Sequence, residues 1–97
     1  MSNQIRAAGL PWFVAEDYES FRRVLLDRQW HRTYSEWEAA ANQTFQRIQN
    51  QGIRPVKAKV ISSDFVNWCN STGRNIDTNA LIAFANEAAY RDIVGDH

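Results

Sequence analysis

The chain has 97 residues, of which 44% are hydrophobic, 23% are charged and 12% are aromatic. This composition excludes a disordered chain, and the length favours one domain built around a single core. Eleven basic and eleven acidic residues give a formal net charge of zero, so the overall charge does not indicate a polyanionic partner.

The groups that usually stabilise very small domains are scarce in this sequence. Cys69 is the single cysteine, which excludes an intrachain disulfide, and His31 and His97 are the only histidines. No spacing resembles a metal site, so we expect no cofactor. Residues 1–14 lack the continuous apolar stretch of a signal peptide, and no run approaches the ~18 apolar residues of a membrane helix. We therefore expect a cytoplasmic protein that does not enter a membrane.

The N-terminal segment precedes the first clear element. Residues 1–8 are polar, and we expect them to form a flexible arm of a single domain that spans residues 1–97. The apolar run 10–14 can form an extended segment or a strand, and Pro11 restricts such a strand to an edge or to its first residues. Acidic residues then open a predicted helix over residues 16–27, where the helix dipole favours them.

A polar connector at residues 28–33 leads to the most clearly marked helix. Thr33-Tyr34-Ser35-Glu36 has the pattern of a capping box, in which the first and last side chains satisfy free backbone donors. An apolar stripe at helical spacing follows, and Gly52 suits a left-handed helix terminus. We expect this helix of about five turns to form the spine of the domain.

The segment 55–61 is predicted to be a strand. Val56, Ala58 and Val60 alternate with polar positions, including Lys57 and Lys59, which is typical of a half-buried strand. A single strand cannot satisfy its own backbone, so it needs a partner. That partner is either the segment 10–14 or the same strand of a second copy, and we favour pairing within the chain.

Two further helices are expected after this strand. Ser62 or Ser63 should cap the first of them, which Gly73 ends, and Asp77 should cap the second, with Gly95 past its end. The whole chain is then an α+β protein, mostly helical, with about four helices and one or two short strands in a single compact domain. The predicted core consists of Tyr18, Phe21, Leu25, Trp37, Ala41, Phe45, Ile48, Val56, Val60, Phe65, Trp68, Cys69, Leu81, Phe84 and Ala88.

Basic and aromatic residues alternate in the connector, and further basic residues follow in the strand. Aromatic rings beside guanidinium groups are one way in which proteins hold single-stranded nucleic acid. The alternative is that Trp30 closes over the core while the arginines are solvated or paired, and the zero net charge favours this alternative. The candidate binding residues are Arg28, Trp30, His31, Arg32, Arg54, Lys57 and Lys59.

Cys69 has two interpretations. It could act as a nucleophile or redox sensor if it were accessible and close to a base such as His31. It also lies at helical spacing from Phe65, on the side of the helix that should be buried, and free cysteine is among the most buried residue types. We favour a core position.

Several short patterns together resemble a known group of sequences. They are Tyr18-x-x-Phe21-Arg22, Thr33-Tyr34-x-x-Trp37, Gly52 before a basic strand, Ser62–Phe65, Trp68-Cys69 and Gly73. In these patterns the chain resembles a group of short bacterial proteins with a domain of unknown function, over about residues 17–90. The resemblance implies a bacterial cytoplasmic protein that shares their fold, and it carries over no catalytic residues.

Three functional hypotheses remain. The favoured one is a non-enzymatic protein-interaction module that binds another protein or a second copy of itself as a homodimer, because no catalytic constellation is visible and a strand edge is left for another chain to extend. The second, less favoured, is a nucleic-acid binder that uses the basic and aromatic candidates. The third is a small-molecule binder or enzyme around His31, Tyr34 and Cys69.

Overall fold

The computed structural model describes residues 7–94. In chain order the elements are β1 (Ala7–Trp12), the short 3-10 helix η1 (Ala15–Asp17), α1 (Tyr18–Val24), α2 (Tyr34–Asn50), β2 (Arg54–Lys59), α3 (Ser62–Thr72) and α4 (Thr78–Val94). The predicted class is confirmed: the chain is a single α+β domain, mostly helical, with four α-helices and two short strands in its described part.

The two strands form a parallel pair. Their register runs from Ala7 opposite Arg54 to Trp12 opposite Lys59, and α1 and α2 lie in the connection between the strands. Parallel strands need such a long connection because the chain must return to the same end of the sheet. Pairing within the chain, which we favoured, is therefore confirmed for β2. Strand β1 begins at Ala7, so the last two residues of the predicted arm belong to the sheet, whereas residues 1–6 lie outside the described part.

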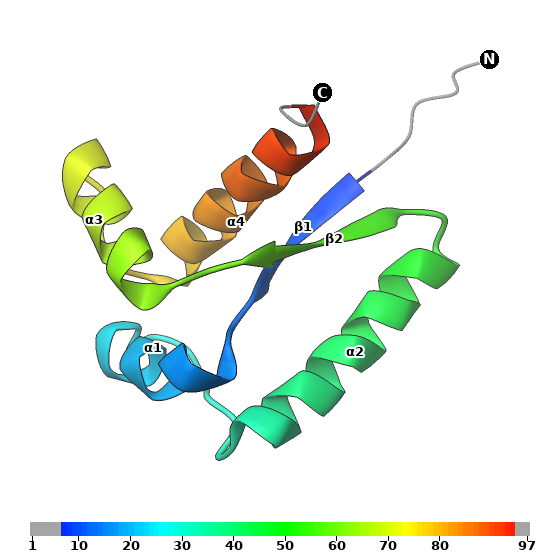
Figure 1. Cartoon of the computed structure of the whole chain (residues 1–97), viewed down its shortest axis with the longest axis horizontal. Helices are drawn as coiled ribbons and strands as arrows, with labels where there is room; N and C mark the ends of the chain where they lie inside the picture. Colours follow the sequence, from blue (N-terminus) through cyan, green and yellow to red (C-terminus); the bar gives the residue numbers. More distant parts are fainter. Residues whose placement is uncertain (1–6, 95–97) are drawn as a thin grey trace.

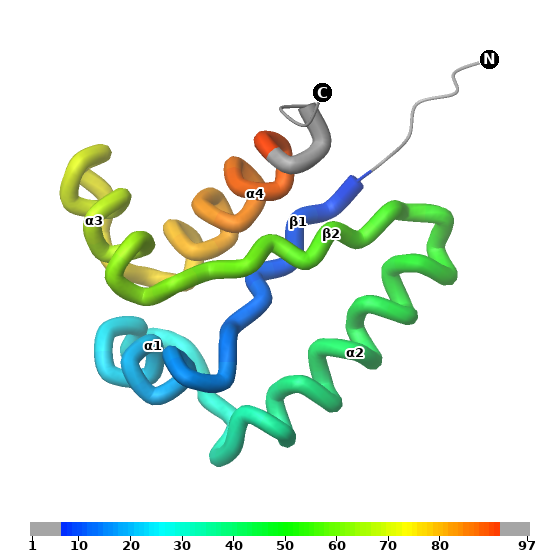
Figure 2. The backbone as a smooth tube through the Cα atoms, in the orientation of Figure 1, coloured from blue at the N-terminus to red at the C-terminus, as the bar shows by residue number. Residues whose placement is uncertain are grey.

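Helices α2 and α4 lie on opposite sides of the strand pair (Figure 1). On the α4 side, a Cβ at Gly9 would lie 2.9 Å from the carbonyl oxygen of Ala85 and 2.9 Å from the Cβ of Ala89, so helix and strand approach closely only because Gly9 has no side chain. On the α2 side, the rings of Trp12 and Trp37 meet edge to face, with their centroids 5.1 Å apart. The start of β1 consequently lies beside the second half of α4 (Figure 2).

The prediction that the second helix forms the spine is wrong. Trp37 is the one residue of α2 that is fully buried, and the rest of the helix is half-buried or exposed. The two strands take the central position, because helices pack against both of their faces, as is usual for parallel strands.

Phe13, directly after β1, is the centre of the core. Its ring is fully buried and lies 4.8 Å from Phe21, 5.0 Å from Trp37 and 5.1 Å from Trp30, measured between ring centroids. Aromatic pairs at these distances and tilted angles are favourable beyond the area that they bury. The predicted core omitted Phe13, as well as four small buried residues, Ala58, Ala80, Ala85 and Ala89.

Two aspartates near the ends of α1 bind the first residues of α3 and α4. The carboxylate of Asp17 accepts hydrogen bonds from the backbone N–H and the hydroxyl of Ser62, both at 2.7 Å. Asp27 accepts from the backbone N–H of Thr78 at 3.1 Å and from its hydroxyl at 2.9 Å. A carboxylate at a helix N-terminus satisfies free N–H groups and suits the helix dipole. These bonds join segments that lie 45 and 51 positions apart in the sequence.

These contacts explain two differences from the expected helices. The first helix ends at Val24 instead of residue 27, because the backbone adopts an extended conformation at Leu25. Asp27 therefore lies beyond the helix, and its carboxylate binds the first residue of α4. No serine side chain caps α3, since Ile61 is the capping residue and Asp17 supplies the carboxylate. The caps predicted at Thr33 and Asp77 are confirmed, with hydrogen bonds from the Glu36 N–H and the Ala80 N–H respectively.

The contact between Asp27 and Thr78 predicts a pH dependence of stability. The hydrogen bonds from Thr78 hold the pKa of Asp27 below its usual value of 3.8. A carboxylate with a lowered folded-state pKa stabilises the fold above its unfolded-state pKa, and this contribution is lost as the pH falls through the lowered value. We expect Asp27→Asn to melt at a lower temperature than the wild type at neutral pH, and the difference to shrink below about pH 4. Thermal melts followed by circular dichroism check this, and an equal difference at neutral and strongly acidic pH would contradict it.

Candidate groove between α2 and α4

A groove of about 320 Å³ lies where β1, the connector at residues 25–33, α2 and α4 meet. Its lining is mainly apolar, with a few polar groups at intervals, which is the usual composition of a ligand site. The residues that line it are Leu10, Pro11, Trp12, Arg28, His31, Trp37, Ala40, Ala41, Thr44, Thr78, Leu81 and Ile82. These residues together define the groove.

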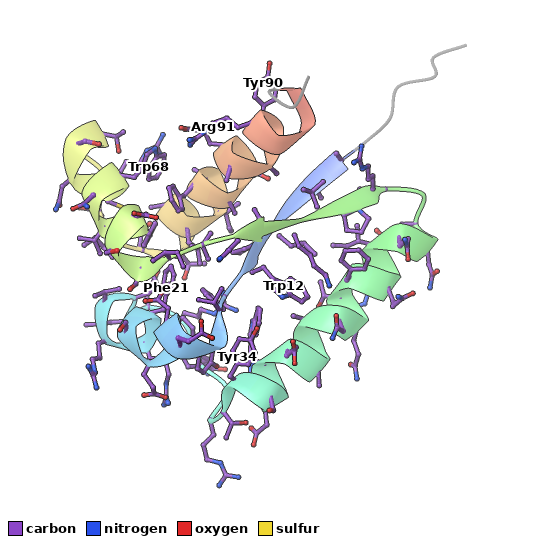
Figure 3. All side chains as sticks on the ribbon, in the orientation of Figure 1. Trp12, Phe21, Tyr34, Trp68, Tyr90 and Arg91 are labelled. Atoms are coloured by element: carbon purple, nitrogen blue, oxygen red, sulfur yellow. The ribbon has the colours of Figure 1, made fainter. Side chains whose placement is uncertain are left out.

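Small side chains on α2 leave room for the groove. Beyond Trp37, α2 faces the groove with Ala40 and Ala41 and, one turn later, Thr44, so this part of the helix presents only small side chains. The indole of Trp12 extends from β1 into the space between the strands and α2 (Figure 3). On the α4 side, Ile82 remains 47% exposed at the edge of the groove.

The free edge of β1 offers backbone carbonyl groups as hydrogen-bond acceptors in this region, but few N–H donors. The carbonyl of Trp12 accepts from the Val60 N–H at 3.1 Å, so the backbone groups of even-numbered residues in β1 face β2 and those of Gly9 and Pro11 face away. Pro11 has no N–H, and the N–H of Gly9 donates to the side-chain oxygen of Asn86 at 3.3 Å. This edge is therefore poorly suited to pairing with a further strand, whereas the carbonyl groups of Gly9 and Pro11 remain open as acceptors.

Hydrogen bonds fasten the connector over the core. The hydroxyl of Tyr18 donates to the carbonyl of His31 at 2.8 Å, and the indole N–H of Trp30 donates to the carbonyl of Leu25 at 2.8 Å. The hydroxyl of Tyr34 donates to the carbonyl of Phe13 at 3.0 Å and thereby ties the start of α2 to the end of β1 (Figure 3). The side chains of Arg28 and His31 are thus presented to the groove from a fixed backbone.

Arg28 is half-buried and forms no ion pair within the described part of the chain. Its guanidinium carbon lies 5.1 Å from the centroids of both the Phe13 and Trp30 rings, a distance typical of cation–π contacts. Burial lowers the pKa of Arg28, and the nearby Tyr18 acts in the opposite direction. The chain therefore holds a partly desolvated cation beside an apolar groove.

The seven predicted binding residues do not form one site in the structure. Arg28 and His31 line the groove together. Trp30 packs into the core, and Arg32 forms an exposed pair with Glu36 at 3.5 Å. The other three lie on β2, where Arg54 and Lys59 are exposed and the Lys57 ammonium lies 4.4 Å from the Trp12 ring centroid and 5.2 Å from that of Phe45.

Most residues that line the groove were not predicted from the sequence. Leu10, Ala40 and Ile82 were not named as site residues, because each is an ordinary apolar residue in its own segment. One signal was available: three consecutive alanines, with a threonine one turn later at position 44, give α2 a stretch of small side chains among larger ones. That pattern indicates space beside the helix, but not which other segments border it.

Cys69 is fully buried in α3 and does not line the groove with His31. Burial raises the pKa of its thiol, with Asp77 acting in the same direction and Arg74 in the other. Since the thiolate is the reactive form, we expect native Cys69 to resist alkylation by iodoacetamide near neutral pH and to react fully in urea. Mass spectrometry of the intact protein measures this, and rapid stoichiometric labelling of the folded protein would show that the thiol is accessible.

The described residues offer neither a cluster of metal ligands nor a helix that could span a membrane. Between residues 7 and 94, no three side chains of histidine, cysteine, aspartate or glutamate gather in a way that could hold a metal ion. Within the same range, every helix is too short or too polar to cross a membrane.

Comparison of the chain with protein-family models, with curated proteins and with solved structures gives no match. The resemblance to short bacterial proteins therefore stays a prediction that rests on the quoted patterns.

Proposed function

We propose that this protein is a non-enzymatic interaction module that docks an apolar segment of a partner protein in the groove. The observation that carries this proposal is the combination of a mainly apolar lining, an exposed Ile82 at the edge and an Arg28 that has no ion pair among the described residues. Apolar side chains left at a surface, with a few polar groups among them, are typical of binding sites for partners.

The groove supports docking by side chains rather than by strand addition. An open strand edge was one ground for the favoured hypothesis, but β1 lacks free N–H donors at Gly9 and Pro11. An extended partner pairing along that edge would leave its own acceptors unmatched. An apolar side chain inserted between α2 and α4 avoids this cost, because it needs no hydrogen bonds.

The other two hypotheses receive less support. Stacking on Trp30 requires a free ring face, whereas this ring packs against Phe13, Tyr18 and Phe21 and its N–H is already bonded. A nucleophilic Cys69 requires access, and this side chain is 0% exposed. Neither a basic–aromatic surface nor a thiol–histidine site therefore explains the described geometry as well as a docking groove does.

The test compares two tryptophan substitutions on neighbouring residues of α2. Ala40→Trp should fill the groove, whereas Ala39→Trp places the same side chain on the exposed side and serves as the matched control. Tagged wild-type protein and both variants are used to capture proteins from the native cell lysate, with and without nuclease. Retained proteins are identified and then recombined with the module in purified form.

We expect a stoichiometric protein partner that resists nuclease and is retained by the wild type and by Ala39→Trp but not by Ala40→Trp. Retention that is equal for both variants would place the binding site elsewhere. Material lost on nuclease treatment would favour the nucleic-acid hypothesis instead. Thermal melts of both variants confirm that any loss of binding does not result from unfolding.

A further inference from the structure

The position of Arg28 indicates more about the occupant of the groove. The arginines that form ion pairs in the described part of the chain, Arg22, Arg32 and Arg91, all do so with a glutamate on their own helix or next to it. Arg28 is more buried than a typical surface arginine, yet the groups around it are the rings of Phe13 and Trp30. The cation–π contacts with these rings leave the N–H donors of the guanidinium without a carboxylate partner in the described chain, so an anion from outside can bind them.

No carboxylate of the described chain fills this role. Asp27 is next in sequence, but its carboxylate is bound by the N–H and hydroxyl of Thr78 at the start of α4. His31 lines the same groove and can donate a hydrogen bond to an anion there. Two side chains that can bind a carboxylate thus border a mainly apolar groove.

The size of the groove limits what can carry that carboxylate. A volume of about 320 Å³ is at the small end of ligand sites, which span roughly 300–1,000 Å³. This volume accommodates one large side chain together with the groups attached to its α-carbon. A ligand for this groove needs an apolar side chain and a nearby carboxylate. The last residue of a protein chain has both, because its side chain and its carboxylate are attached to the same carbon atom.

The strand edge favours a peptide over a free carboxylic acid. The carbonyl group of Pro11, which lines the groove, faces away from β2 and is open as a hydrogen-bond acceptor. A peptide brings backbone N–H donors that can reach such acceptors, whereas an aliphatic acid brings none. We infer that the groove binds the C-terminal residue of a partner chain, with its apolar side chain between α2 and α4 and its carboxylate on Arg28. This inference rests on the proposed function and names the partner's chemistry.

The experiment uses peptides rather than lysate. A displayed library with free C-termini and randomised last residues is selected on the purified protein, and the best peptide is synthesised as a free acid and as a C-terminal amide. Affinities are measured from tryptophan fluorescence or calorimetry for the wild type, Arg28→Gln and Arg32→Gln. Arg32 is the matched control because it is exposed and already paired with Glu36.

We expect selection of a large apolar last residue, and binding of the amide at least about tenfold weaker than that of the free acid. Arg28→Gln should lose a similar factor and should no longer distinguish acid from amide, whereas Arg32→Gln should bind like the wild type. The comparison of acid and amide on the wild type needs no variant, so it holds even if Arg28→Gln folds poorly.

The possible failures are distinguishable. Equal binding of acid and amide, or selection of an internal sequence, would overturn the carboxylate inference while the interaction module stands. Octanoate binding as tightly as the best peptide would also overturn it, in favour of a small carboxylic acid. If no peptide is selected although Ala40→Trp abolishes capture of a purified partner, the inference that the groove binds a C-terminal residue fails, whereas the proposed interaction module stands. If neither binding is seen, both proposals fail.

Discussion

Replacing Phe13 by alanine should lower the free energy of unfolding by about 3–5 kcal/mol, because a fully buried ring is removed and its neighbours cannot close the cavity. The ring contacts Phe21, Trp30 and Trp37, which come from three different segments of the chain. Their loss therefore loosens the junction of β1, α1, the connector and α2 at once. Urea unfolding followed by tryptophan fluorescence measures the change.

A small domain can fail to fold when it loses this much, since total stabilities are about 5–15 kcal/mol. Phe13→Leu is the milder companion, for which we expect a loss of about 1–2 kcal/mol. Phe45→Ala is the matched control, because Phe45 is only half-buried. A Phe13→Ala protein with the same urea midpoint as Phe45→Ala would show that the core is centred elsewhere.

Asp17→Ala should cost about 2–4 kcal/mol, because it removes two charge-assisted hydrogen bonds and leaves polar groups of Ser62 without a partner. Ser62 is only 7% exposed, so water cannot readily replace the lost carboxylate. The contact also joins η1 to α3, which means that its loss frees two elements that are far apart in sequence. The free energy of unfolding is again obtained from urea titrations.

A double-mutant cycle separates this contact from other effects of the substitution. Ser62→Ala removes the hydroxyl partner, and Asp17→Ala combined with Ser62→Ala should cost less than the sum of the two single changes. Asp64→Ala, an exposed acid in the first turn of α3, is the control for a general loss of charge near the helix. Additive losses for Asp17 and Ser62 would mean that the two side chains do not act together.

The features predicted correctly from the sequence are those with a local cause. The hydrogen bond from the Glu36 N–H to the Thr33 hydroxyl involves residues three positions apart, so the sequence pattern contains both partners. Gly52 and Gly73 adopt positive φ angles of 80° and 71°, which few other residues tolerate. The alternation in β2 is confirmed only in part: Ala58 is buried and Lys57 and Lys59 are exposed, but Pro55 on the expected outer side is buried and Val56 is half-buried.

The features that the sequence did not reveal depend on segments that meet only in the folded chain. Nothing near Asp17 or Asp27 shows that each will bind a helix start 45 or 51 positions away. Phe13 belongs to the proline-containing run 10–14, which predicts an edge or the start of a strand, although the packing of α1, the connector and α2 around it buries its ring. Such residues follow from tertiary packing rather than from period or propensity.

In the candidate site, too, residues marked by a local sequence pattern were predicted and those that depend on tertiary packing were not. The connector was singled out because basic and aromatic residues alternate there, and two of its members, Arg28 and His31, do line the groove. The pattern does not show that Trp30 is a packing residue, since an indole suits a core as well as a binding surface. The remaining walls come from β1, α2 and α4, and only the fold brings them together.

The most direct test of the groove as the docking site is the indole N–H spectrum of the four tryptophans during titration with the purified partner. Trp12 and Trp37 line the groove, whereas Trp68 packs against Phe84 between α3 and α4 and serves as an internal control (Figure 3). Two-dimensional ¹⁵N NMR, assigned with single tryptophan-to-phenylalanine variants, resolves each resonance. We predict that the signals of Trp12 and Trp37 shift in proportion to the bound fraction while that of Trp68 stays in place. A shift of Trp68 alone, with Trp12 and Trp37 unchanged at saturation, would contradict the account.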